Sequence, residues 1–350
     1  MAERTVHPVI LCGGVGSRLW PESTPTRPKA FLPLTSDLTL LQETAVRVAR
    51  IAGAGPALVV ASQPHVEEVL GEFRDVGVAC RVIAEPAGRG SAPAIAAACL
   101  EVAAADPDGL VLVAACDHFV PDSAAFAAGV AASLAAAEQG AIVTFGVKPD
   151  RPSTAYGYIR PGEAHVGDVR RVAAFVEKPD PERAAQLLAE GCLWNSGNFV
   201  FRADVLIAEL EAREPALMAA ARASREAASK SGHATFLSDD FLAARDVAID
   251  VAVMEKTDRA AVLPIDYAWS DLGAWDSVLD AARRDEAGNA SKGRVKLDDC
   301  QNTLVRAEPG VRVVAIGLSN IAVVVENGAV LICDLGRAQD VRTAAEGIDD

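Results

Sequence analysis

Residues 11–18 read LCGGVGSR and directly follow a short apolar run. The three glycines of this loop leave backbone N–H groups unobstructed by side chains, so several of them can point at one anion. Ser17 adds a hydroxyl and Arg18 a guanidinium, and both groups suit phosphate oxygens. The spacing is neither GxxxxGK[ST] nor GxGxxG, which argues against a Walker A loop and a dinucleotide fingerprint. The loop therefore predicts a phosphate cradle of another kind, with a glycine-rich turn that binds nothing as the alternative.

A lysine and two aspartates could complete phosphate chemistry. Lys29 lies in TRPKAFLPL, where the preceding proline restricts the backbone and suits a fixed phosphate contact, although a solvated surface lysine is the alternative. Asp117 in CDHF ends an apolar run, and a carboxylate there can hold Mg²⁺ or cap a turn. Asp271 lies in WSDLG. Zinc is a poor expectation, because no second His or Cys stands at ligand spacing.

The first half of the chain predicts alternating strands and helices. Five apolar runs predict strands, namely PVILCGG, ALVVAS, CRVIAEP, GLVLVAACD and AIVTFGV. The segments between them predict helices at LLQETAVRVARIA and at residues 64–75, 92–105 and 124–139. Continuous apolar strands separated by helices indicate an α/β fold, with a mostly parallel sheet covered on both faces. Ligands bind at the carboxyl ends of such strands, where CGGVGSR, EPAGRGSAP and CDHF stand.

The second half is more mixed. Strands are expected in DVRRVAAFVEKP and LWNSGNFVFRA, with helices at residues 181–190 and 203–228. After about residue 290 the pattern changes to short β runs with turns, and ENG reads as a hairpin turn. We therefore expect a catalytic domain over residues 1–288 and a small all-β domain over residues 289–350.

Composition restricts the class of protein further. The chain has 350 residues, 51% of them hydrophobic, and a net charge of −15 that argues against nucleic acid as a partner. No apolar run reaches the length of about 18 residues that would predict a membrane helix. The N-terminus lacks the pattern of an export signal, which favours a cytoplasmic location. Seven cysteines without a CxxC pair favour reduced thiols over a disulfide framework.

These strings together resemble a known family. GGVGSRLWPESTPTRPKAFLPL is similar to the signature of the sugar-nucleotide pyrophosphorylases, which are sugar nucleotidyltransferases. LWP and RPKAFLPL favour the mannose-1-phosphate guanylyltransferase (GDP-mannose pyrophosphorylase) branch. EPAGRGSAPAI resembles EPxxRNTAPAI, with Gly90 and Ser91 in place of the more usual Asn and Thr. We expect Ser91 to cap the helix that follows. The resemblance covers about residues 6–285 and, more loosely, the β tail to about residue 342.

The resemblance implies a Rossmann-like nucleotide-diphospho-sugar transferase fold with a β-helix-like C-terminal domain. It implies that GTP and mannose 1-phosphate react to GDP-mannose and pyrophosphate, in a homodimer. Mg²⁺, or Mn²⁺, would bind Asp117 and Asp271, and the catalytic cations would be Arg18, Lys29 and Lys178. The nucleotide would contact Leu11, Gly13, Gly14, Gly16, Ser17, Arg18, Lys29, Glu85, Pro86, Arg89, Ser91, Ala92 and Asp117. The sugar phosphate would contact Gly157, Glu177, Lys178, Asn195 and Gly197. The segment IDVAVMEK also matches the family, without an assigned role.

Three other functions are alternatives to this one. The same chemistry could act on another sugar 1-phosphate, of heptose or glucose, or on another NTP. A regulatory protein that only binds nucleotide sugars should have lost the metal carboxylates or the two cations, Arg18 and Lys29, and all four are present. A dehydrogenase is disfavoured, because the glycine spacing is wrong and Ser62 and Gln63 stand where an acidic residue is required.

Overall fold

The computed structural model describes residues 5–347, and the chain divides into two compact units. The larger unit consists of Met1–Gly13, Thr44–Cys116 and Val120–Trp269. The smaller unit consists of Gly14–Glu43, Asp117–Phe119 and Ser270–Asp350. Each unit is therefore assembled from segments that lie far apart in the sequence. The domain boundary expected at residue 288 stays a prediction.

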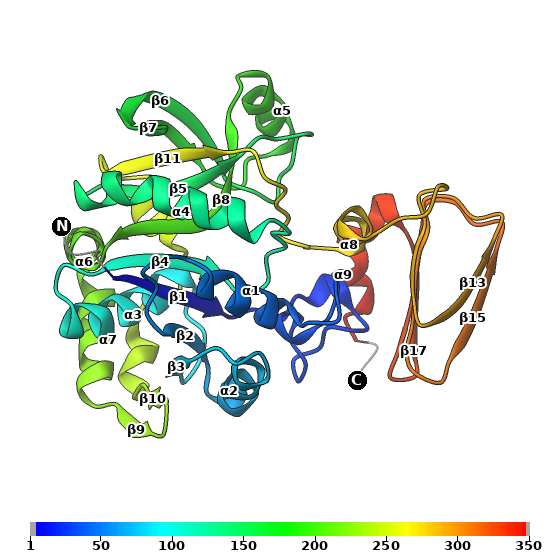
Figure 1. The fold of residues 1–350 in the computed structure, drawn as a ribbon, viewed down its shortest axis with the longest axis horizontal. Coiled ribbons are helices and arrows are strands. Elements are labelled where there is room, and N and C mark those ends of the chain that lie inside the picture. The colour runs from blue at the N-terminus through cyan, green and yellow to red at the C-terminus, as the bar shows by residue number, and fades with distance from the viewer. Residues whose placement is uncertain (1–4, 348–350) are drawn as a thin grey trace. The chain divides into compact units, whose positions relative to one another are not determined.

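The larger unit is built on one eleven-stranded sheet, with strand order β5-β11-β7-β6-β8-β4-β1-β2-β3-β10-β9 (Figure 1). Its central strands β4, β1, β2 and β3 are parallel, and β8 joins β4 in the antiparallel direction. The predicted α/β class, with a mixed and mostly parallel sheet, is confirmed. The strands are β1 Val6–Cys12, β2 Ala57–Ser62, β3 Cys80–Glu85, β4 Leu110–Ala115, β5 Ile142–Val147, β6 Tyr158–Val166, β7 Val169–Val176, β8 Leu193–Arg202, β9 Ser229–Ser231, β10 Ala234–Phe236 and β11 Ala260–Ile265.

Ala-rich helices pack against this sheet. The core between α3, α6, α7 and the sheet contains Val9, Leu58 and Val111, all nearly inaccessible to solvent. Phe126 of α4 packs edge-on against Phe145 of β5, with ring centroids 6.0 Å apart. The apolar strand runs are buried from both sides, as expected of parallel strands. The helices are α1 Leu40–Ala49, α2 Val66–Asp75, α3 Ser91–Ala105, α4 Ser123–Glu138, α5 Pro181–Ala189, α6 Ala203–Arg213 and α7 Pro215–Glu226.

The single helix expected over residues 203–228 is wrong. Two helices, α6 and α7, occupy this stretch, and Glu214 separates them in a non-helical conformation. Pro215 is the cause, because proline lacks the N–H that would continue α6 and is instead favoured at the first position of a new helix.

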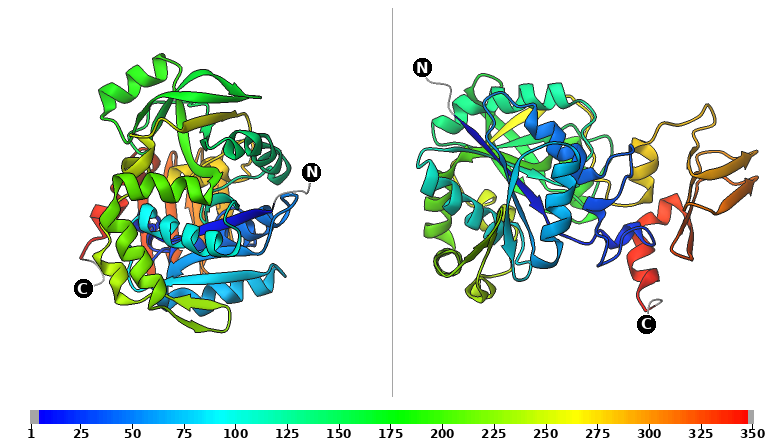
Figure 2. Two further views of the ribbon diagram at one scale, coloured as in Figure 1. Left: turned by 90° about the vertical axis from the view of Figure 1, so that its left-hand side faces the viewer. Right: turned by 60° about the horizontal axis from the view of Figure 1, so that its bottom comes forward.

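The smaller unit contains the C-terminal β structure. A four-stranded sheet, β12-β14-β16-β17, faces the two-stranded sheet β13-β15 across a core that includes Val305, Ala315 and Val323 (Figures 1 and 2). The predicted ENG hairpin is confirmed, because β16 and β17 are antiparallel and Asn327 and Gly328 both have positive φ. The strands are β12 Ala290–Lys292, β13 Arg294–Asp298, β14 Leu304–Ala307, β15 Arg312–Ile316, β16 Ile321–Glu326 and β17 Ala329–Asp334, and the helices are α8 Trp275–Ala281 and α9 Val341–Ala345.

Two absences hold within the described residues 5–347. The cysteines form no disulfide there. None of the helices in that range combines the length and the apolar character needed to cross a membrane.

Candidate active site

The glycine loop packs closely against Lys29 in the smaller unit. Gly16 has φ 75°, and a Cβ added to it would lie 2.5 Å from the Cβ of Lys29, so only glycine fits beside that side chain. The Lys29 N–H donates to the carbonyl of Val15 at 3.0 Å, and the Ser23 hydroxyl donates to the same carbonyl. Arg18 lies half-buried in the short 3₁₀ helix that follows Gly16. The loop and the lysine are therefore one local structure.

Lys29 joins the two aspartates that were expected to bind a metal. Its Nζ lies 2.9 Å from Asp117 Oδ2 and also donates to the main-chain oxygen of Asp271. The lysine is only 5% exposed. Phe119 and Ser270 exchange two backbone hydrogen bonds, of 2.9 and 3.1 Å, which brings the two aspartate segments side by side. A cation and two carboxylate residues from three distant segments thus meet in the smaller unit.

The electrostatics of Asp117 suit a divalent ion. Burial alone would raise the pKa of this carboxyl, but the charges of Lys29 and His118 and the hydrogen bond from Lys29 outweigh it, so the pKa lies below its usual value. Asp117 is therefore ionised at neutral pH. The Asp271 carboxylate accepts a hydrogen bond from Gly273 N at 3.1 Å, which fixes its orientation. Two carboxylates together with substrate phosphates are a typical set of Mg²⁺ ligands, so these residues fit the expected ion.

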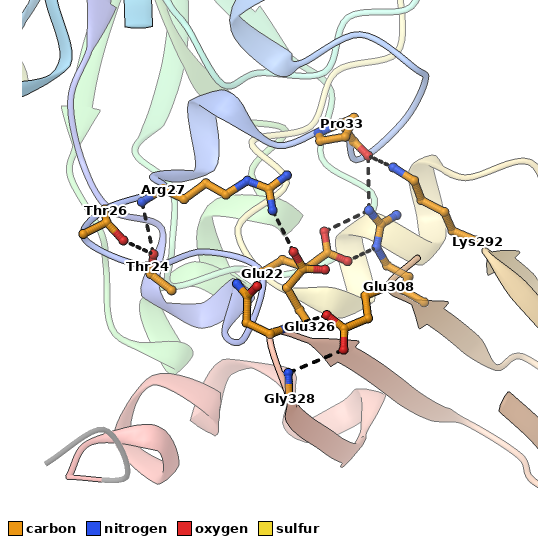
Figure 3. Close-up of polar contacts among 11 residues, drawn as sticks. Glu22, Thr24, Thr26, Arg27, Pro33, Lys292, Glu308, Glu326 and Gly328 are labelled. Atoms are coloured by element: carbon orange, nitrogen blue, oxygen red, sulfur yellow. Dashed lines mark hydrogen bonds and ion pairs between the residues drawn. The ribbon is translucent and has the colours of Figure 1, made fainter. Parts of the chain in front are cut away.

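A buried ion pair anchors the segment that carries Arg18 and Lys29. Arg306 of β14 holds both carboxylate oxygens of Glu22, at 2.6 and 2.9 Å, and both side chains are at most 10% exposed. Arg306 also donates to the carbonyl of Pro33, as does Lys292 at 2.7 Å. Figure 3 shows these contacts around Glu22. They fasten the segment between the glycine loop and α1 to the C-terminal β strands.

Glu85 ends β3 in the larger unit and is 7% exposed. Its Oε1 is buried and has no hydrogen-bond partner among the described residues. Burial raises the pKa of this carboxyl to about 7. A buried, unpartnered acceptor is costly for the fold, and such groups cluster at binding sites where a ligand supplies the missing donor.

The base loop, which we define as residues 85–92, has an unusual conformation at Gly90. This glycine has φ 75° and ψ 177°, a region that essentially only glycine occupies, and an added Cβ would lie 2.6 Å from the carbonyl of Val247. The expectation that Ser91 caps α3 is wrong, because Gly90 takes the cap position. The Ser91 hydroxyl instead accepts a hydrogen bond from Ile249 N at 2.9 Å. The other base-loop residues expected to bind the nucleotide are Pro86, Arg89 and Ala92.

The residues expected to bind the sugar also gather in the larger unit. A Cβ on Gly157 would lie 2.5 Å from Glu177 Oε2, so glycine at this position lets the carboxylate approach the backbone closely. Lys178 has φ 43°, its side chain is 63% exposed, and its Nζ lies 3.1 Å from Glu177 Oε1. Asn195 N donates to the Gly157 carbonyl at 2.8 Å. Asn195 Oδ1 in turn accepts from Gly197 N at 3.2 Å.

Two residues of the same region were not singled out from the sequence. Asp250 accepts a hydrogen bond from Asn195 Nδ2 at 2.8 Å, and Glu255 accepts one from Glu177 N at 3.3 Å. Both belong to the IDVAVMEK segment. In the sequence, the only local sign of a role for Asp250 is that a carboxylate stands directly before the apolar run VAVM.

The expected site residues therefore form two groups, each compact within its own unit. The smaller unit brings together Gly14, Gly16, Ser17, Arg18, Lys29, Asp117 and Asp271, whereas the larger unit holds Leu11, Gly13, the base loop and the sugar group. The chain passes from one unit to the other between Gly13 and Gly14, inside the glycine loop.

Comparisons with known proteins agree with this chemistry. A family model described as nucleotidyl transferase matches residues 7–288. The chain is 43% identical over 347 residues to the xanthan biosynthesis protein XanB of Xanthomonas campestris pv. campestris (strain B100), spanning 98% of this chain and 73% of that protein. It is 40% identical over 357 residues to the mannose-1-phosphate guanylyltransferase of Escherichia coli (strain K12), spanning 99% and 74%. A crystal structure described as mannose-1-phosphate geranyltransferase from Thermus thermophilus matches with a TM-score of 0.87 and 30% identity, covering 99% of this chain and 100% of that one.

Proposed function

The chain belongs to the nucleotidyl transferase family, and from this premise we propose that it transfers the guanylyl group of GTP to mannose 1-phosphate. The products are GDP-mannose and pyrophosphate. Support for the sugar and the base comes from relatives of 38–40% identity that carry this activity in their names. Support for the chemistry comes from the residues of the two groups described above.

The observation that carries the proposal is the position of Lys29. Its ammonium group lies against the Asp117 carboxylate and the Asp271 main chain, directly beside Gly16. A buried cation that contacts one aspartate carboxylate and the main chain of a second aspartate, beside a glycine-rich loop, is suited to polyphosphate and a divalent ion. The same set has no role in hydride transfer or in hydrolysis by a nucleophilic side chain.

In this reaction a phosphate oxygen of the sugar phosphate attacks the α-phosphorus of GTP. The bond from the α-phosphorus to the bridging oxygen breaks, and that oxygen leaves with pyrophosphate. No covalent enzyme intermediate is required, because the nucleophile is already an anion, so the protein contributes positioning and charge. Arg18 and Lys29 offset the charge of the leaving pyrophosphate, and Lys178 holds the incoming phosphate. Mg²⁺, when bound by Asp117 and Asp271, neutralises phosphate charge.

Glu85 favours guanine as the base. A carboxylate can accept two hydrogen bonds side by side from the N1–H and N2 amino group of guanine, whereas uracil and thymine offer one such donor. The unpartnered Oε1 of Glu85 requires a donor of this kind. The buried carboxylate therefore supports GTP over UTP and dTTP.

The deciding experiment measures pyrophosphate release with each of GTP, ATP, UTP and dTTP, against mannose 1-phosphate, glucose 1-phosphate and a heptose 1-phosphate, with Mg²⁺. We expect kcat/KM to be highest for GTP with mannose 1-phosphate. A higher value for another pair would assign the enzyme to that sugar or base. Binding without any turnover, across the whole panel, would support a regulatory protein instead. The homodimer, Mn²⁺ as an alternative ion, and the cytoplasmic location stay predictions.

A further inference from the structure

The segment Val247–Glu255 connects the base loop to the sugar group within the larger unit. At its start, the Val247 carbonyl accepts from Ala92 N at 3.1 Å and Val247 N donates to the Arg89 carbonyl at 3.2 Å. At its end, Glu255 accepts from Glu177 N. Between these points, Asp250–Met254 forms one turn of π-helix, which Glu255 N closes onto the Asp250 carbonyl at 2.9 Å. Single π turns are rare in proteins, and those that occur are often found at functional sites.

Asp250 is held toward the sugar group by a chain of hydrogen bonds. The Thr144 hydroxyl, fully buried, donates to Asn195 Oδ1 at 2.7 Å, and Gly197 N donates to the same oxygen. The Gly197 N–H can only donate, so the amide atom that faces it is the oxygen of Asn195. Its nitrogen must therefore point to Asp250 Oδ1, at 2.8 Å. This contact uses one carboxylate oxygen of Asp250 and sets the direction of the other.

The carboxylates of Asp250 and Glu177, both in the larger unit, influence each other through their charges. Burial, together with the nearby negative charge of Glu177, raises the pKa of Asp250 to about 7, while Lys178 and the Asn195 amide oppose the shift. Repulsion between like charges opposes folding, and residues whose pKa is shifted by burial and by a neighbouring charge are often found at functional sites. Ring hydroxyls of a sugar are donors that a carboxylate can accept beside its existing contacts.

We propose that Asp250 is a sugar-binding residue, which accepts a hydrogen bond from one ring hydroxyl of the hexose 1-phosphate beside Glu177 and so helps to select the sugar. This inference rests on the proposed function for the identity of the substrate. Because Asn195 holds one oxygen of Asp250, the carboxylate presents the other to a hydroxyl at a fixed position. A sugar whose hydroxyl lies elsewhere on the ring then leaves this acceptor unsatisfied, which is how a polar site discriminates strongly between analogues.

The test compares Asp250→Asn with the control Asp258→Asn, an exposed aspartate eight residues further along. Asparagine at position 250 can still accept from Asn195, so the hydrogen-bond network is retained. We expect KM for the sugar phosphate to rise about 10- to 100-fold in Asp250→Asn, with KM for GTP nearly unchanged. Circular dichroism and thermal melting check the fold, and Asp250→Ser serves as a second variant if Asp250→Asn does not fold.

Deoxy sugar phosphates identify the contact itself. Each single-hydroxyl deletion of the sugar phosphate is measured with wild type and with the folded Asp250 variant, as a double-mutant cycle. One analogue should lose about tenfold or more in kcat/KM with wild type and lose nothing further with the variant. Losses that are additive for every analogue, or a variant that behaves as Asp258→Asn does, would overturn the proposal.

Failure of the proposed function gives a different result. In that case the wild type releases no pyrophosphate from GTP with mannose 1-phosphate. The same cycle is then run on whichever sugar phosphate the wild type uses or, without turnover, on calorimetric binding of mannose 1-phosphate. Equal affinities of wild type and Asp250→Asn in that measurement would overturn the role of Asp250.

Discussion

The carboxylates of the two units differ in how the protein treats their charge. In the smaller unit, Asp117 is paired with a buried lysine, and its pKa is held below the usual value. In the larger unit, Glu85 is buried and Asp250 half-buried, neither forms an ion pair with a lysine or arginine among residues 5–347, and the pKa of each rises to about 7. The carboxyl group is therefore stabilised in its charged form in the smaller unit, whereas burial in the larger unit favours its neutral form.

This difference matches two kinds of recognition. Phosphates and a divalent ion are charged, so a site that binds them needs side chains that stay ionised and carry the opposite charge. A base and a sugar present neutral N–H and O–H donors, so their site needs acceptors that are buried and unsatisfied until the ligand arrives. The opposite pKa directions therefore fit the proposed roles, with charge neutralisation expected in the smaller unit and selection of base and sugar expected in the larger unit.

The largest expected effect comes from Asp271 in the smaller unit. Asp271→Asn preserves the acceptor for Gly273 N and the main-chain contact with Lys29, but removes the charge that a divalent ion requires. We expect kcat/KM to fall by a factor on the order of 10³ with the fold unchanged, as for other preorganised charges. Steady-state pyrophosphate release measures this, with Asp298→Asn on exposed β13 as the control. Near-normal rates would remove Asp271 from the metal site.

The second effect concerns the support of the smaller unit. Arg306→Met leaves the buried Glu22 carboxylate without its partner, so we expect the free energy of unfolding to fall by about 3–5 kcal/mol. Chemical denaturation measures this loss. The double variant Glu22→Gln with Arg306→Met should recover part of it, because no buried charge remains unpaired. If the single and double variants lose the same free energy of unfolding, the loss does not come from an unpaired buried carboxylate at Glu22.

The smallest effect concerns Glu85 in the larger unit, whose pKa shift has the opposite sign to that of Asp117. Because the pKa of Glu85 is about 7 in the folded protein and 4.5 as its ordinary value, the folded state holds this proton more tightly. The free energy of unfolding should therefore fall as the pH rises from about 4.5 to about 7, by up to about 3 kcal/mol for this group. The pKa of Asp117 is lowered in the folded protein, so its contribution to the free energy of unfolding is lost only at a pH below about 4. Asp117 therefore adds almost nothing to the pH dependence between about 4.5 and 7.

Denaturation of wild type and Glu85→Gln at pH 5 and pH 8 reads this slope directly. The glutamine variant should lose a little under half of the pH dependence, and Asp250, whose pKa rises from 3.8 to about 7, should account for most of the rest. An unchanged slope in Glu85→Gln would mean that Glu85 is ionised in the folded protein and that the contrast between the units is wrong.

Sequence reasoning predicted the α/β class and the β tail, because both follow from apolar runs and short-range turns. It also brought together Lys29, Asp117 and Asp271 as one chemistry, although only the structure shows that they touch. The break between α6 and α7 has a local signal in the sequence, because Pro215 stands at the start of the second helix. The capping role of Ser91 could not be corrected from sequence, because the conformation of Gly90 depends on Val247, far along the chain.

Asp250 shows the other limit. Its partner Asn195 lies 55 positions away, and the hydrogen bond depends on how Thr144 and Gly197 orient the amide. No local pattern contains that information. The contacts of Asp250 in the larger unit are of this long-range kind, whereas the glycine loop is encoded in one continuous string of residues.

The backbone at Gly90 also bears on how this base loop can change over generations. A side chain at position 90 meets the Val247 carbonyl, and ψ of 177° at positive φ excludes every other residue. Asparagine at position 90 would therefore require a shift of the Val247 segment in the same step. We expect substitutions of Gly90 to be accepted only together with compensating changes in that segment.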